Sequence, residues 1–203
     1  MLAQTAADRG REVRRKLLSA AAELIGELGW NAVSTRILAE RAGVAPGLVH
    51  YHFQSLQALL CEAAVGTMRD VLSATEPMFE RAETLDAGLD MLLGSLDVYT
   101  GTDTTSLLFV EAYLAATRDE SLRGALTALV ADFRADLARW LGERGQEMPD
   151  DTASVLAAAV DGMMLHRALN PELTSAVVAP VLRKLLTPTK SGRSSTAGGV
   201  DEK

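Results

Sequence analysis

The chain has 203 residues, enough for one medium domain or for a small domain joined to a larger one. Its net charge of −7 argues against a protein that binds nucleic acid over its whole surface, but the charge is unevenly distributed. Residues 1–60 hold 7 Lys or Arg against 5 Asp or Glu, whereas the remainder holds 13 against 22. A mildly basic N-terminal part on an acidic body fits DNA binding through one end of the molecule.

Cysteine content and hydropathy restrict the cellular compartment. The single cysteine, Cys61, excludes an intramolecular disulfide, and its place beside Leu60 predicts an ordinary small apolar residue. The N-terminus lacks a hydrophobic signal region, and no apolar run reaches the ~18 residues of a membrane span. We therefore expect a cytoplasmic protein that makes no contact with a membrane.

The first predicted element is an amphipathic helix that ends at Gly29. Its apolar residues recur every three or four positions, at Val13, Leu17, Ala20, Ala21, Leu24, Ile25 and Leu28. A basic cluster, which includes Arg14 and Arg15, lies just before and inside this helix. These cations can follow a phosphate backbone or simply form a solvated helix start.

Residues 29–60 predict a helix, a tight turn and a second, very short helix. Ser34 is placed to cap the first of these helices, Gly43 to make the turn, and Pro46 to begin the second, which we expect to end near His52. The expected inward residues are Leu38, Ala39, Ala42, Val44, Val49 and Phe53. This layout is that of a helix-turn-helix DNA-binding head, which places one short helix in a major groove.

The predicted outer side of the short helix carries aromatic and imidazole groups, which suit contact with phosphates, sugars and base edges. Arg36 lies in the first turn of the preceding helix, where a guanidinium can reach a guanine edge or a phosphate. The candidate DNA-contacting residues are Arg14, Arg15, Ser34, Thr35, Arg36, Pro46, Gly47, Leu48, His50, Tyr51 and His52.

About 50 residues carry a specific pattern: Gly29-Trp30, Ser34, Leu38-Ala39, Ala42-Gly43-Val44, Gly47, Val49, His50-Tyr51-His52-Phe53 and Ala58-Leu59-Leu60. This pattern resembles the tetracycline-repressor (TetR) family of bacterial regulators. Two positions depart from it. Leu56 stands where the family often has a lysine that neutralises a phosphate, and Leu48 replaces a common small polar residue and can instead touch a thymine methyl group.

The remaining chain reads as successive helices, which gives an all-α fold: an N-terminal three-helix helix-turn-helix head and a C-terminal helical body for ligand binding and dimerisation. We place the head at 1–55, the body at 56–187 and a disordered Gly/Ser-rich tail at 188–203. The helices are expected near 56–76, 84–99, 104–117, 120–144, 151–169 and 172–187.

Dimerisation is expected through the helices near 120–144 and 151–169. The second of them has apolar residues on more than one face and must be buried on two sides. The first offers Leu126, Leu129, Val130, Phe133, Leu137, Trp140 and Leu141. Asp161-Gly162 followed by Asn170-Pro171 also resembles the dimerisation helix of the family. Two heads related by a two-fold axis would read a palindrome.

The resemblance implies a small-molecule cavity within the body and regulation by population shift. Such cavities are mostly apolar with few polar groups, so we expect an apolar effector. The candidate ligand-binding residues are Met68, Phe79, Leu92, Tyr99, Phe109, Glu111, Tyr113 and Met163. Each can equally be an ordinary core residue.

The predicted function is therefore a ligand-responsive, sequence-specific DNA-binding regulator, expected to be a repressor, acting as a homodimer on a palindromic operator. An alternative is a DNA-binding dimer that has no small-molecule effector and is controlled by a protein partner, or one that acts as an activator. An enzyme or carrier is disfavoured because no phosphate loop or nucleophile motif is present. We expect no cofactor and no metal, since His50 and His52 diverge on a helix.

Overall fold

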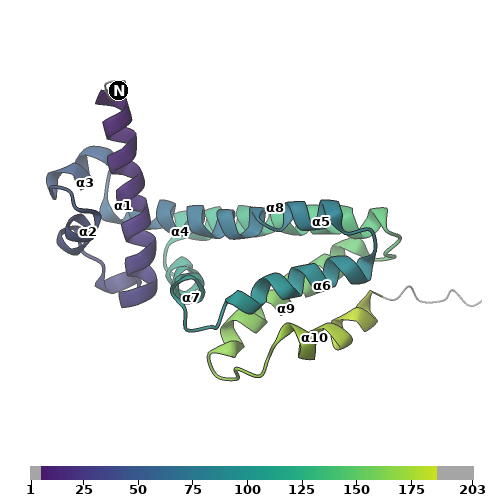
Figure 1. The fold of residues 1–203 in the computed structure, drawn as a ribbon. Coiled ribbons are helices and arrows are strands. Elements are labelled where there is room, and N and C mark those ends of the chain that lie inside the picture. The colour runs from purple at the N-terminus through teal and green to yellow at the C-terminus, as the bar shows by residue number, and fades with distance from the viewer. Residues whose placement is uncertain (1–5, 187–203) are drawn as a thin grey trace, which may run out of the picture.

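A computed structural model describes residues 6–186, and every regular element within that range is helical. The arrangement confirms the predicted all-α fold, with an N-terminal helix-turn-helix head and a helical body (Figure 1). The predicted tail at 188–203 lies outside the described residues. Within residues 6–186, no helix is both long enough and apolar enough to cross a membrane.

The head consists of α1 (Ala6–Leu28), a 3-10 turn η1 (Trp30–Ala32), α2 (Thr35–Ala42) and α3 (Gly47–His52). The buried residues of these helices match the predicted periodicity, and Leu17, Leu38 and Val49 are fully buried. Leu28 is the exception: it was predicted in the apolar stripe of the first helix but is 47% exposed at the end of α1. The apolar stripe of α1 therefore packs on α2 and α3 and holds the two short helices in place.

The body contains α4 (Leu56–Ser73), α5 (Glu76–Arg81), α6 (Leu85–Ser95), a 3-10 turn η2 (Leu96–Val98), α7 (Thr104–Ala116), α8 (Glu120–Glu143), α9 (Pro149–Arg167), α10 (Ser175–Leu182) and a 3-10 turn η3 (Arg183–Leu185). Helices α4, α5 and α8 form one layer, and α6, α9 and α10 form the other (Figure 1). Helix α7 lies between the head and these layers and packs on α1.

Three predicted helix boundaries were wrong. The helix expected near 56–76 ends at Ser73, and a short helix, α5, follows it, with Pro77 in its first turn, where the missing N–H of proline leaves no hydrogen bond unmade. The helix expected at 84–99 becomes 3-10 after Ser95. The helix expected at 172–187 is shorter, since it starts at Ser175 and Pro180 lies inside it, before the change to 3-10 geometry at Arg183.

Two apolar clusters form the core. One runs from the head into the body, from Leu17 and Leu38 through Leu59 to Leu108 and Leu122. The other fills the far half of the body around Leu93, Leu137 and Trp140, among others. Because the first cluster is continuous, movement of α4 or α7 must also disturb the packing of α1.

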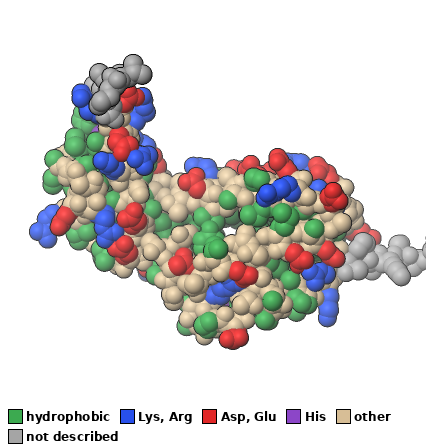
Figure 2. Space-filling view, in the orientation of Figure 1, with side chains coloured by type: hydrophobic (Ala, Val, Ile, Leu, Met, Phe, Trp, Pro, Cys, Tyr) green, Lys and Arg blue, Asp and Glu red, His purple; other side chains and the backbone are tan. Residues whose placement is uncertain are grey.

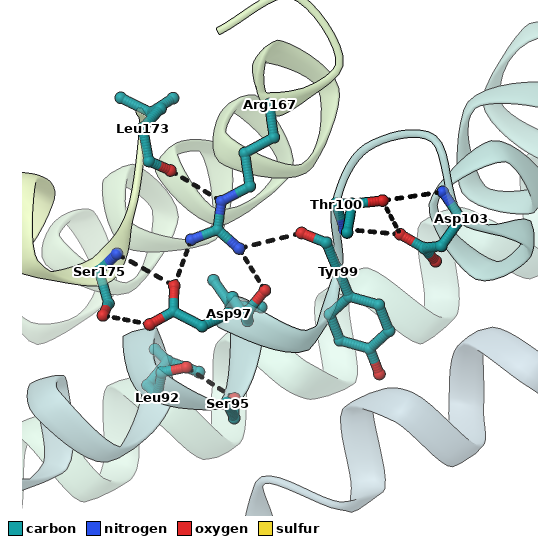
Figure 3. A network of polar contacts seen from close by, with 10 residues as sticks. Leu92, Ser95, Asp97, Tyr99, Thr100, Asp103, Arg167, Leu173 and Ser175 are labelled. Atoms are coloured by element: carbon teal, nitrogen blue, oxygen red, sulfur yellow. Dashed lines mark hydrogen bonds and ion pairs between the residues drawn. The ribbon is translucent and has the colours of Figure 1, made fainter. Parts of the chain in front are cut away.

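A buried arginine joins three segments at the edge of the body (Figure 3). Arg167, at the end of α9, is 5% exposed. Its guanidinium donates to the carbonyl oxygens of Leu96, Tyr99 (3.0 Å) and Leu173 (2.7 Å), and Nη2 lies 2.5 Å from Asp97 Oδ1. One side chain thus connects α9 to the turn after α6 and to the loop before α10.

Asp97 completes this cluster. Its carboxylate accepts hydrogen bonds from the backbone N–H of Ser175, at 3.1 Å, and from the Ser175 hydroxyl. Partial burial raises the pKa of Asp97, but the bonds from Ser175 and the charge of Arg167 outweigh it and hold the pKa below its ordinary value. The Asp97 carboxylate therefore stays charged near neutral pH and fixes the start of α10 through Ser175.

Candidate functional site

The turn between α2 and α3 has the geometry of a helix-turn-helix. Ser34 Oγ accepts from the N–H of Ile37 at 3.4 Å and caps α2. Gly43 ends the helix with φ 64° and ψ 38°, a left-handed conformation that a side chain would disfavour. Phe53 ends α3 and is buried with Val49, so the inner side of the short helix is fixed to the head.

The outer side of α3 is open to solvent. Tyr51 is 80% exposed, and its ring meets the ring of His52 edge to face at a centroid distance of 5.0 Å. His50 and Gly47 are also exposed, and Leu48 and His52 are half-buried. Gly47, His50 and Tyr51, spaced three and four residues apart, therefore share one exposed face of α3. His52 lies toward α1 instead, since its Cε1 is 3.8 Å from where a Cβ at Gly10 would stand.

Arg36 differs from most other arginines of the head because no carboxylate within residues 6–186 pairs with it. Arg14 pairs with Glu62 at 2.6 Å, and Arg15 pairs with Glu12 at 2.8 Å. Arg36 is exposed and has no carboxylate partner in the described part of the chain. The Arg36 guanidinium can bind a base or a phosphate without first breaking an ion pair, whereas Arg14 would have to separate from Glu62.

A glutamate of the body binds the first residue of the 3-10 turn η1. Glu111 on α7 accepts from the backbone N–H of Trp30 at 2.8 Å, and Trp30 Nε1 donates to Gln57 of α4 at 3.3 Å. Close by, a Cβ at Gly26 would overlap the backbone carbonyl of Thr104, so the backbones of α1 and α7 approach each other directly at this point. The head is thereby fixed to the two body helices next to it.

Replacing Glu111 with alanine is expected to cost about 1–2 kcal/mol of stability and to loosen the head, because the half-buried Trp30 N–H loses its acceptor. Urea unfolding and operator affinity measure the two effects. Glu111→Gln is the matched control, since its amide oxygen can still accept. Equal stability of wild type and Glu111→Ala would show that the bond contributes nothing.

A cavity of about 240 Å³, here the inner cavity, lies within the body. Helices α4 to α9 contribute to its wall. The lining residues are Val71, Leu72, Ala74, Thr75, Met78, Leu92, Ser95, Leu96, Tyr99, Phe109, Phe133, Val160, Asp161 and Met164. Figure 2 shows an opening between the layer of α4 and α8 and the layer of α6 and α9. The wall is apolar and aromatic, as expected for a small-molecule site.

A second hollow, the outer pocket, lies between α7 and α9 and has a volume of about 350 Å³. It shares Phe109, Asp161 and Met164 with the inner cavity. Tyr113 also lines it, and the Tyr113 hydroxyl donates to Asp161 Oδ2 at 3.1 Å. The two hollows therefore meet at one carboxylate.

The structure brings together only part of the predicted ligand set. Leu92, Tyr99 and Phe109 line the inner cavity, and Tyr113 lines the outer pocket. The other four lie elsewhere: Met68 and Met163 in the packed core, Phe79 against open grooves beside α8, and Glu111 on Trp30. In place of Met163, its neighbour Met164 faces both hollows.

Comparison with known proteins decides the family. A family model described as "Bacterial regulatory proteins, tetR family" matches residues 17–63, and one described as "Tetracyclin repressor-like, C-terminal domain" matches residues 80–188. The chain belongs to the TetR family. It is therefore a DNA-binding transcriptional regulator and not an enzyme.

Relatives cover nearly the whole chain. An HTH-type transcriptional regulator of Mycobacterium tuberculosis is 28% identical over 195 residues, 92% of this chain and 98% of the relative. A transcriptional regulator from Streptomyces coelicolor A3(2) has a similar structure, with a TM-score of 0.73 and 26% identity, covering 87% of this chain and 99% of that one.

Two less similar structures share the fold and hold small molecules. A transcriptional regulator from Saccharomonospora viridis, in complex with choline, has a TM-score of 0.72 and 17% identity and covers 87% of this chain and 96% of that one. FadR from Bacillus subtilis, in complex with stearoyl-CoA, has a TM-score of 0.68 and 16% identity and covers 86% and 97%. At these identities the likeness shows the fold alone.

Leu56 is the departure from the TetR pattern that matters most for phosphate contact. It is the first residue of α4, directly after the cap Ser55, and it is half-buried against the head core. The N–H groups and positive dipole of that helix end favour a phosphate, and a lysine would add a full charge.

Leu56→Lys is expected to tighten operator binding and to steepen its salt dependence by about one charge, since a lysine stem can keep the leucine packing while its ammonium reaches solvent. Anisotropy titrations at several salt concentrations measure the slope. Ser73→Lys, at the far end of α4, adds the same charge away from the head. If both variants have the wild-type slope, residue 56 does not approach a phosphate.

Sequence patterns missed two polar residues of these sites. Asp161 was noted only as part of a resemblance to the dimerisation helix, although a carboxylate among Val160, Met163 and Met164 is unusual. The sequence does not distinguish Arg167, because it lies at a helix end, where a cation is ordinarily solvated. The signal available for Asp161 was one charge within an otherwise apolar stretch, whereas Arg167, next to His166, has no such signal.

Proposed function

We propose that the protein is a homodimeric repressor that binds a palindromic operator and releases it when a small molecule occupies the inner cavity. Residues 1–55 are the DNA-binding domain, and residues 56–187 bind the ligand and dimerise. One observation carries this proposal: the inner cavity is lined from α4 and α7, and both of these helices pack on α1. A ligand that moves either helix therefore shifts α1, and with it α2 and α3, the helices that would contact DNA.

Helix α9 supports the dimer with an exposed apolar row. Val155 is 51% exposed, Leu165 is 53% exposed and Leu169, just past the helix, is 86% exposed. Ala158 and Gly162 lie between them, so the row keeps the three- and four-residue spacing of one helix face. A row of this kind on a soluble protein is typical of a protein–protein interface.

Helix α8 supports the dimer differently from the sequence prediction. Of its large apolar residues, Leu126, Leu129, Phe133, Leu137, Trp140 and Leu141 are buried within the protomer. Its exposed face carries small residues instead: Gly124, Ala125, Ala128, Ala131 and Ala135. Small side chains let a second helix approach closely, so α8 and α9 of two copies can form a four-helix interface.

Ligand response in this proposal is a shift between two states. An effector changes DNA affinity only as far as it binds those states unequally. Choline and stearoyl-CoA in two proteins of the same fold are chemically unlike, and they support a small-molecule effector without selecting its class.

The test combines three measurements on the full chain. Light scattering gives the mass, expected to be that of a dimer; anisotropy with a selected promoter fragment gives affinity; a metabolite library is then screened for saturable release. A reporter behind the same promoter should rise when the regulator is deleted, and a fall would make it an activator. Specific binding that no library member alters would favour control by a protein partner.

A further inference from the structure

The inner cavity and the outer pocket share one charged lining residue, Asp161 on α9. The Asp161 carboxylate accepts a hydrogen bond from the Tyr113 hydroxyl, and no cationic side chain pairs with it in residues 6–186. Burial raises its pKa above the ordinary value, and the Tyr113 bond offsets this only in part. A carboxylate in this position is short of a positive partner.

The surfaces around that carboxylate suit a cation. Tyr99, Phe109 and Phe133 line the inner cavity, and Tyr113 lines the outer pocket. The electron-rich faces of aromatic rings attract ammonium groups, most strongly where water is excluded. The ring of Tyr99 points away from the Arg167 guanidinium (Figure 3), which pairs with Asp97 instead. The buried arginine therefore does not cover this ring.

We propose that the effector is an organic cation, an amine or a quaternary ammonium, whose charged group lies against Asp161 while its apolar part fills the inner cavity. The proposal rests on the assignment of that cavity as the effector site. The lining holds no Lys, Arg or His, so the carboxylate or phosphate of an acyl compound would meet like charge without compensation.

The first test measures direct binding to the full-length protein without DNA. Octyltrimethylammonium, octan-1-ol and octanoate each carry an eight-carbon chain, counting the carboxyl carbon of octanoate, with a cationic, a neutral and an anionic head. Calorimetric titration should give at least about tenfold tighter binding for the cation than for the alcohol, with octanoate the weakest. Octan-1-ol or octanoate binding as tightly as the cation would overturn the proposal.

The second test assigns the preference to one side chain. Asp161→Asn should weaken octyltrimethylammonium about tenfold or more and leave octan-1-ol unchanged, because only the charge is removed. Asp70→Asn, on an exposed part of α4, is the matched control and should leave both affinities unchanged. An unaltered cation affinity in folded Asp161→Asn would refute the role of Asp161; if that variant does not fold, the ranking on wild type decides.

Failure of this inference is distinguishable from failure of the proposed function. Release of operator DNA by a neutral or anionic molecule would leave the ligand-responsive repressor intact and remove the cation assignment. If the cation binds in a way that Asp161→Asn abolishes, but its binding does not change the affinity for DNA, the cation site stands and the proposed effector response is refuted.

Discussion

Replacing Arg36 or Tyr51 with alanine is expected to cost about 1–3 kcal/mol of specific operator binding each, and replacing both should abolish specificity. The reason is local: Arg36 is exposed without an internal carboxylate partner, and Tyr51 is 80% exposed on the outer side of α3. Neither side chain supports the head core, so circular dichroism and dimer mass should be those of wild type.

Anisotropy titrations with the selected operator and with a scrambled duplex separate specific from non-specific binding. Arg139→Ala, which removes another exposed arginine at the far end of α8, is the control and should bind as wild type. If the double variant binds operator with wild-type affinity, the reading surface assigned to α2 and α3 is wrong.

Replacing Arg167 with leucine is expected to lower the free energy of unfolding by about 3 kcal/mol or more, the largest stability effect we predict. The substitution removes the donor for three backbone carbonyls and leaves Asp97 with only its Ser175 bonds. It should release the segment before α10 first, because Arg167 is what joins that segment to α9.

Urea unfolding at one fixed protein concentration measures this loss. Arg123→Leu removes an exposed arginine that pairs with Glu120 and should change stability by less than about 1 kcal/mol. Because folding lowers the pKa of Asp97, the ionised Asp97 side chain stabilises the folded state fully above its ordinary pKa of 3.8. This stabilisation is lost as the pH falls through the lowered pKa. The difference in free energy of unfolding between wild type and Arg167→Leu should therefore become smaller in that acidic range. Equal losses of stability in Arg167→Leu and Arg123→Leu would contradict the role of Arg167.

The head could be predicted closely because its signals are local. A cap at Ser34, a left-handed turn at Gly43 and apolar spacing toward Val49 each determine the backbone within a few residues. The outward position of Tyr51 followed from the same spacing. Such determinants act within one or two turns of helix, and the sequence displays them directly.

The cavity could not be predicted to the same degree because it depends on the relative rotation of six helices. Met163 and Met164 are adjacent and equally apolar, yet only Met164 lines the hollows. Glu111 was predicted as a ligand contact, but the close approach of α1 and α7 at Gly26 brings it to Trp30. These outcomes depend on contacts between residues far apart in the chain, which periodicity alone does not encode.

The central claim, that α2 and α3 read a specific operator, is tested most directly by selecting bound fragments from the source genome with the full-length protein. Wild type should enrich a palindrome whose half-sites lie about 34–36 Å apart or farther, as two heads on a two-fold axis require. The Arg36→Ala, Tyr51→Ala double variant should enrich none. Absence of any enriched site with folded wild-type dimer, or the same site with both proteins, would contradict the assignment.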